Sequence, residues 1–310
     1  LRRLAQPASS PRLIDSYRPR VEQTVDQLID KIDPTGTVDL VPAFAAPLPI
    51  AVITDLLGVP DADADRFAAI GTEFGSALEG IRSLRHAARL RSAQRELLAL
   101  FESLFELRRR EPADDVISRI VAAEGDDIRP AEMVPMCSLL LVAGFETTVN
   151  LIGNAVKALL DHPDQWAGLC ADTSLAPKVI EETLRWDPPV QRTARTARED
   201  LTIEGVRVRE GQIVLTLLGS ANRDPSVFPS ADRFDIHREQ VADHMAFSSG
   251  IHYCVGAPLA RLEATIAVQR LAERLPGLRR AGPVKRRTSS LVRGPISLPV
   301  RVARSVVPAA

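Results

Sequence analysis

The chain has 310 residues, of which 45% are hydrophobic and 25% charged, and its formal net charge is −1. This length supports a large buried core, and we expect one domain spanning residues 1–310. A nearly balanced charge provides no basic surface field, so we expect no nucleic-acid partner.

The three cysteines are Cys137, Cys170 and Cys254. They provide no disulfide framework and fit a reducing compartment, so we expect a cytoplasmic protein. The chain begins without Met and without the apolar region of a signal peptide. Its longest apolar run, around residues 139–143, is shorter than a bilayer requires, so we expect no membrane span. We also expect a monomer.

The first half of the chain is expected to be helical, because apolar residues recur there at spacings of three and four. An apolar segment that ends at Gly58-Val-Pro60 has the composition of a buried helix followed by a stop. The expected helices cover residues 11–32, 48–57, 84–110 and 129–160, and a short strand-like break covers 37–41.

The second half mixes helices with short strands. Pro177 opens a helix that stops at Asp187-Pro188. Apolar residues then alternate over 201–208 and 211–217, where Gly205 marks the turn of a hairpin. A helix over 257–274 and a strand-like segment over 291–300 complete the pattern. We therefore predict a mainly α fold with small β-sheets, of the α+β class.

The most informative segment runs Phe247-Ser-Ser-Gly250-Ile-His252-Tyr-Cys254-Val-Gly256-Ala-Pro-Leu-Ala-Arg261. It places one cysteine on a glycine-flanked loop that enters a helix. Glycines let a flat ligand approach the backbone, and the positive end of a helix favours a thiolate. A lone cysteine at a helix start is more often structural, but the whole pattern indicates a sulfur ligand to haem iron.

This segment resembles the haem-binding loop of the cytochrome P450 family. The resemblance implies that Cys254 is the axial thiolate ligand of the iron of haem b. It also implies that Phe247 shields the sulfur from water, and that Gly250 and Gly256 contact the cofactor. Ser248 replaces a glycine often found there, and we expect strain if its backbone angles are unusual.

A second motif, Ala143-Gly144-Phe145-Glu146-Thr147-Thr148, lies in the expected helix over 129–160. Small residues and Thr147 share one face, which leaves room for something flat. Taken alone, the motif fits a packing glycine, an exposed Glu and a hydrogen-bonded Thr. It resembles the oxygen-activating helix of cytochromes P450, which implies that Ala143 and Gly144 contact the cofactor. Thr147 would then help to hold dioxygen and position water, while Glu146 would relay protons.

A third motif, Glu182-Thr-Leu-Arg185, places an acid and a base on one side of a helix. Such pairs are common on surfaces and contribute little there. The family has a buried pair of this kind, completed by an arginine from a short aromatic motif. The segment Ala231-Asp-Arg-Phe234 fits that motif, so the resemblance implies a structural network of Glu182, Arg185 and Arg233.

Haem carries two propionates, which cations bind. The resemblance implies that His252 and Arg195 bind them, in preference to Arg192 or Arg198. The opening Leu1-Arg2-Arg3-Leu4 is similar to the end of the family's His-x-x-x-Arg helix, which assigns Arg2 to the same role. We therefore expect a cytochrome P450 fold without its N-terminal helices and outer strands, with roughly a quarter of a typical member absent.

The expected function is a monooxygenase that inserts one atom of dioxygen into a small lipophilic substrate, by C–H hydroxylation or epoxidation. Its electrons would come from a ferredoxin and a ferredoxin reductase, as in bacterial members. Two alternatives keep the haem site: a peroxygenase that uses hydrogen peroxide, and a non-catalytic truncated remnant. A third is a zinc module built from His237, His244, His252 and Cys254, whose spacing matches no compact ligand pair.

Overall fold

The computed structural model describes residues 11–33, 35–77, 80–81, 83–239 and 243–302. The longer helices are α2 (Pro11–Asp30), α3 (Pro47–Leu57), α4 (Asp61–Ala77), α5 (Leu84–Arg110), α7 (Pro130–Asp161), α9 (Ala176–Trp186) and α11 (Ala257–Arg274). The shorter helical segments are η2 (Val41–Ala45), α6 (Val116–Ala122), α8 (Pro163–Ala171), η3 (Thr173–Leu175), α10 (Leu218–Ala221) and η4 (Gly250–His252). The strands are β1 (Thr37–Asp39), β2 (Thr193–Thr196), β3 (Leu201–Ile203), β4 (Val206–Val208), β5 (Ile213–Thr216), β6 (Leu278–Arg280), β7 (Lys285–Arg286), β8 (Pro295–Ser297) and β9 (Pro299–Val302).

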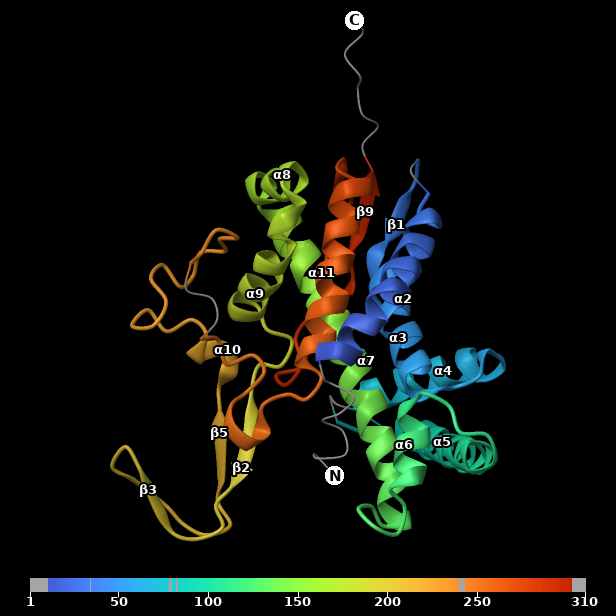
Figure 1. Cartoon of the computed structure of the whole chain (residues 1–310). Helices are drawn as coiled ribbons and strands as arrows, with labels where there is room; N and C mark the ends of the chain where they lie inside the picture. The colour runs from blue at the N-terminus through green and yellow to red at the C-terminus, as the bar shows by residue number, and fades with distance from the viewer. Residues whose placement is uncertain (1–10, 34, 78–79, 82, 240–242, 303–310) are drawn as a thin grey trace, which may run out of the picture.

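Helix α7 is the central element, and α3, α4, α9 and α11 pack around it (Figure 1). Its first half, up to Leu141, joins a hydrophobic cluster with α3, α4, α5 and α6. Its second half, from Phe145, joins a cluster with α2, α9 and α11. The motif that contains Glu146 and Thr147 therefore lies where the two clusters meet.

Helix α7 is much longer and more apolar than the short apolar run that stands out in the sequence. Among the described helices it alone is long and apolar enough to cross a membrane, with a mean hydropathy of 1.5 over its best window. Within the fold, 61% of that window is buried. The apolar composition of α7 is thus explained by its position in the core, where a helix is apolar on most of its faces.

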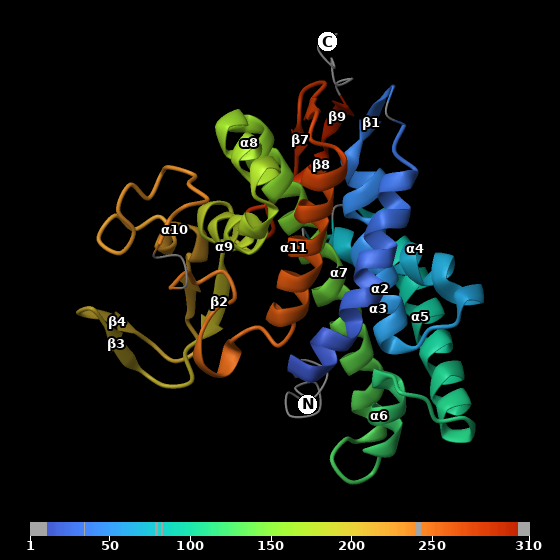
Figure 2. The same cartoon turned by 45° about the horizontal axis from the view of Figure 1, so that its top comes forward.

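The strands form small antiparallel sheets in the orders β1-β9-β6, β2-β5, β3-β4 and β7-β8. The β2-β5 pair and the β3-β4 hairpin lie on the opposite side of the molecule from α4, α5 and α6 (Figure 2). In the β2-β5 register, Arg195 is paired with Val214. The mainly α architecture with small sheets confirms the predicted fold class.

Most expected elements are present, with two differences in the strands. The segment around 211–217 does not extend the hairpin at Gly205, because β5 pairs instead with β2. The expected strand over 291–300 is divided in two, since β8 pairs with β7 whereas β9 pairs with β1 and β6. Each pairing depends on a second segment elsewhere in the chain, so the periodicity of one segment could not reveal it.

Candidate functional site

Backbone hydrogen bonds within the Cys254 loop hold its shape directly before the start of α11. The backbone N–H of Cys254 donates to the carbonyl oxygen of Phe247 at 2.9 Å, and the N–H of Tyr253 donates to the carbonyl of Gly250 at 3.1 Å. Cys254 is exposed, whereas Cys137 is buried. Burial raises the pKa of the Cys137 thiol to about 12. Of these two thiols, only that of Cys254 can reach a ligand from outside.

The backbone of this loop leaves space in front of Cys254. Gly250 has φ of 57°, and a Cβ built on it would meet nothing within 4 Å. A Cβ on Gly256 would meet only the Sγ of Cys254, at 4.0 Å. Ser248 has φ of 60°, a left-handed conformation that is unfavourable for a residue with a side chain. The backbone angle is therefore unusual, and the strain expected in that case is present. The loop thus presents its sulfur beside an open backbone, as a flat ligand needs.

Helix α7 supplies the second set of predicted residues. The hydroxyl of Thr147 donates to the carbonyl oxygen of Ala143 at 2.7 Å, and Ala143 is exposed. Such a bond from Thr to the preceding turn can bend a helix. Gly144 is the next residue along α7 and faces α3, where an added Cβ would contact Ile53 at 3.5 Å. The contact of Ala143 and Gly144 with a cofactor stays a prediction, and for Gly144 the structure shows a packing contact.

Glu146 is buried, with 4% of its surface exposed, and forms an ion pair with Arg287. The side-chain amide of Asn150 donates to the Glu146 backbone carbonyl at 2.7 Å and to its carboxylate at 3.3 Å. A Cβ on Gly75 of α4 would approach Oε2 of Glu146 to 2.5 Å, so Gly75 makes room for the carboxylate. Sequence analysis did not identify Arg287, because its partner is distant along the chain.

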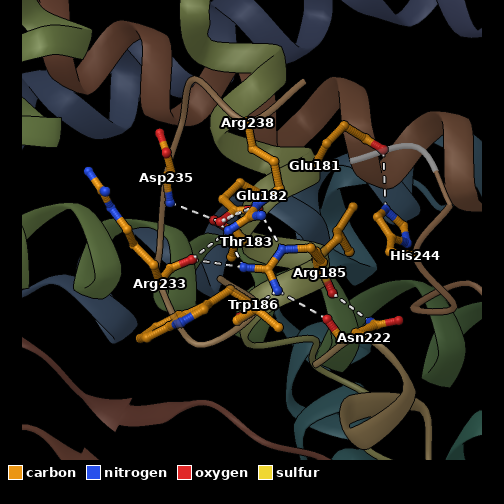
Figure 3. Close-up of polar contacts among 12 residues, drawn as sticks. Glu181, Glu182, Thr183, Arg185, Trp186, Asn222, Arg233, Asp235, Arg238 and His244 are labelled. Atoms are coloured by element: carbon orange, nitrogen blue, oxygen red, sulfur yellow. Dashed lines mark hydrogen bonds and ion pairs between the residues drawn. The ribbon is translucent and has the colours of Figure 1, made fainter. Parts of the chain in front are cut away.

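The predicted structural network is present in part (Figure 3). Arg185 donates two hydrogen bonds to Glu182, from Nε at 2.7 Å and from Nη2 at 2.8 Å, and both side chains are 0% exposed. The prediction that Arg233 is the third member was wrong. Arg238 provides that guanidinium, with its Nε 3.2 and 3.3 Å from the two Glu182 oxygens.

The chain geometry at Phe234 explains this difference. Phe234 is buried, which leaves the neighbouring side chain of Arg233 exposed and pointing away from Glu182 (Figure 3). Only the backbone carbonyl of Arg233 takes part, accepting from Arg185 at 3.0 Å. Arg238 lies four residues beyond Phe234, and nothing in the aromatic motif itself indicated it.

The predicted propionate ligands lie on different elements. Arg195 of β2 donates to the carbonyl of Ala194 at 2.8 Å, and His252 is exposed at the end of η4. Among the described residues no ion pair of Arg195 or His252 is found, so the guanidinium and the exposed imidazole can bind an anionic group. Arg2 lies outside the described residues.

These residues fit a haem group by their chemistry. An exposed thiol beside an open glycine backbone can supply a soft ligand to iron, and the Arg195 guanidinium and the His252 ring N–H can donate hydrogen bonds to carboxylates. The zinc alternative has no equivalent basis, because no group of three or more His, Cys, Asp or Glu side chains gathers among the described residues. His244, one of its proposed ligands, instead contacts Glu181.

Comparison with known proteins agrees with this site. The sequence profile of the Cytochrome P450 family matches residues 82–275. Cytochrome P450 107B1 of Saccharopolyspora erythraea is 44% identical, over 97% of this chain and 74% of its own length. 6-Deoxyerythronolide B hydroxylase of the same organism is 39% identical, over 97% of this chain and 75% of its own.

The fold comparison gives the same answer. The crystal structure of P450BioI in complex with an acyl carrier protein ligated to hexadec-9Z-enoic acid superposes with a TM-score of 0.92 and 38% identity, covering 97% of this chain and 78% of that one. The helices and small sheets described above are those of that fold. This chain therefore belongs to the cytochrome P450 family, the haem-iron monooxygenases, and resembles its bacterial members.

Proposed function

We propose that the chain binds haem b with Cys254 as the axial thiolate and inserts one atom of dioxygen into a small lipophilic substrate. The observation that carries this proposal is the exposed thiol of Cys254, fixed by its own N–H to the carbonyl of Phe247 at 2.9 Å. In this proposal electrons come from a ferredoxin and its reductase, and the protein acts in the cytoplasm as a monomer.

Each predicted residue has a physical role in this proposal. Haem, when bound, supplies the iron that activates dioxygen. Cys254 holds the group by its sulfur, and Arg195 and His252 hold its carboxylates, with Arg2 proposed for the same role. Phe247 covers the loop and limits the access of water to the sulfur.

The distal residues would handle protons. The Thr147 hydroxyl already donates to Ala143, so its oxygen keeps lone pairs free to accept from a water. Glu146 forms an ion pair with Arg287. A proton relay through Glu146 therefore requires its carboxylate to exchange Arg287 for water.

The proposed substrate class follows from relatives and from the site. One relative is named for hydroxylation of 6-deoxyerythronolide B, and another was solved with a fatty acyl group on its carrier protein. Both are largely apolar molecules. Beside Thr147 on α7, Ala143 is exposed and apolar, which favours a lipophilic substrate over a charged one.

Isotopically labelled dioxygen tests this reaction. With ferredoxin, reductase and a lipophilic substrate such as a fatty acid or a macrolide lactone, we expect one labelled oxygen atom in the product and none in the absence of reductant. Product formed with peroxide alone, at the same rate in wild type and Thr147→Ala, would favour the peroxygenase instead.

A further inference from the structure

Arg261 contacts both ends of the loop that carries Cys254. Its guanidinium lies over the ring of Phe247, 4.6 Å from the ring centroid, and its Nη1 donates to the hydroxyl of Tyr253 at 3.0 Å. Phe247 and Tyr253 are also close to each other, with ring centroids 6.3 Å apart. Since Cys254 follows Tyr253 and donates its N–H to Phe247, one guanidinium spans the segment that holds the sulfur.

Glu181 of α9 fixes the orientation of this guanidinium. It accepts from the Nε of Arg261 at 2.6 Å and from Nη2 at 3.0 Å, a two-point pairing that sets the plane of the group. A cation over an aromatic face is attracted by the ring, so Arg261 and Phe247 stabilise each other.

His244 also contacts the carboxylate of Glu181 (Figure 3). The N–H of Ala246 donates to Nδ1 of His244 at 3.3 Å, which leaves Nε2 as the donor to Glu181 at 3.2 Å. Burial raises the pKa of Glu181, but the hydrogen bonds from His244 and Arg261 and the charge of Arg261 outweigh it and lower that pKa to about 2. The Glu181 carboxylate is therefore ionised at neutral pH.

We propose that Arg261, held by Glu181, is a positioning residue that fixes the Cys254 loop and sets the electrostatic environment of the bound haem iron. This inference rests on the proposed ligation by Cys254. Reduction adds one electron to the iron and its thiolate, so a nearby positive charge favours the reduced form and a nearby negative charge opposes it.

The two partners therefore have opposite expected effects. Arg261→Gln removes a positive charge and shifts the reduction potential of bound haem to a more negative value. Glu181→Gln removes a negative charge, so the positive charge of Arg261 is no longer balanced, and the reduction potential shifts to a more positive value. Loosening of the loop alone would move both variants in one direction, so the opposite signs separate an electrostatic role from a merely structural one.

Arg261→Lys separates charge from geometry. Lysine keeps the charge but loses the planar fork and the stacking on Phe247. We expect its potential to lie closer to wild type than that of Arg261→Gln. We also expect a smaller fraction of its reduced carbon monoxide complex to keep the strongly red-shifted band of thiolate ligation.

The control is Arg270→Gln, on the same helix. Arg270 pairs with Glu273 at 2.9 Å, and its side chain is 34% exposed against 31% for Arg261. The experiment measures the reduction potential and the red-shifted fraction of the haem-loaded full chain for these variants and for Cys254→Ser. If Arg261→Gln and Glu181→Gln both match Arg270→Gln, or both shift in one direction, the proposal is overturned.

Two further outcomes keep the tests distinct. If Cys254→Ser keeps the red-shifted band, the proposed ligation itself is wrong, whatever the arginine variants show. If Arg261→Gln fails to take up haem, the sign of the shift in Glu181→Gln decides: a more positive value supports the proposal, and an unchanged or more negative value contradicts it.

Discussion

Glu182 accepts two hydrogen bonds from Arg185, at 2.7 and 2.8 Å, in a pair whose side chains are both fully buried. Arg185 also donates to three backbone carbonyls, those of Asn222, Ala231 and Arg233. The pair therefore joins α9 to the irregular chain that leads towards the Cys254 loop, and the position of that loop depends on it.

Removing Arg185 would take the two short hydrogen bonds from the buried Glu182 carboxylate and leave it only the longer contacts of Arg238 at 3.2 and 3.3 Å. We expect Arg185→Ala to lower the free energy of unfolding by about 3–5 kcal/mol, measured by urea denaturation. The control is Arg207→Ala at the exposed pair Arg207–Asp200, whose side chains are 72% and 52% exposed. Exposed pairs contribute about 0–1 kcal/mol, so a similar loss in both variants would contradict this account.

We expect substitutions of Arg238 and Arg233 to change the free energy of unfolding by different amounts in the same assay. Arg238 bonds to the Glu182 carboxylate and to the carbonyls of Pro229 and Ser230, whereas the Arg233 side chain is exposed. We expect Arg238→Ala to cost about 1–3 kcal/mol, and Arg233→Ala to stay within about 0.5 kcal/mol of wild type. The reverse order would restore Arg233 as the third member of the network.

Ser248 and Gly250 both have left-handed backbone angles, with φ of 60° and 57°. A side chain costs about 1–2 kcal/mol in this conformation, so we expect Gly250→Ala to lower the free energy of unfolding by that amount. Ser248→Gly relieves strain but also makes the unfolded chain more flexible, so we expect no more than a small gain. Gly256→Ala is the control, because Gly256 has φ of −81°. Equal losses at Gly250 and Gly256 would show that φ is not the cause.

Glu263 of α11 is 3% exposed, and its Oε2 has no hydrogen-bond partner among the described residues. Burial raises the pKa of its carboxyl from 4.5 to about 8. Between these values the folded chain binds a proton that the unfolded chain lacks, so this group makes stability fall as pH rises through the window.

The matching experiment compares thermal unfolding of wild type and Glu263→Gln from pH 5 to pH 8. We expect the wild-type midpoint to fall across this range and the variant, which has no carboxyl to ionise, to show a flatter profile and greater stability at pH 8. Parallel profiles would mean that Glu263 does not titrate in this range.

The Thr147 hydroxyl is the proposed site for ordering water on α7, and it bonds back to Ala143 at 2.7 Å. We expect Thr147→Ala to lower the product formed per reducing equivalent consumed, whereas Thr147→Ser, which keeps the hydroxyl, retains most of it. Coupling is measured as the ratio of product to consumed electron donor. An unchanged ratio in Thr147→Ala would remove this role.

Local sequence signals predicted most of the longer helices but not α4 (Asp61–Ala77). The expected helices over 84–110 and 257–274 coincide with α5 and α11, because each has a regular apolar face. The pairing of β2 with β5 could not be predicted, since Thr193–Thr196 is four residues long and lacks apolar alternation. Thr193–Thr196 is a strand only because it pairs with β5.

The candidate site shows the same division between local and long-range information. The Cys254 loop and the Glu182–Arg185 pair are local patterns, and both are where the sequence predicted them. Arg287 beside Glu146 and Arg261 beside Glu181 are contacts between distant segments. Charge pairing of this kind depends on which elements the fold brings together, and no local pattern in the sequence indicates it.

The proposed function depends on Cys254 as the thiolate ligand of haem. The most direct measurement is the difference spectrum of the haem-loaded, reduced chain with carbon monoxide. We predict a strongly red-shifted Soret band in wild type and in Cys170→Ser, and its loss in Cys254→Ser. A band that persists in Cys254→Ser, or an unshifted band in a wild-type chain that has bound haem, would contradict the claim.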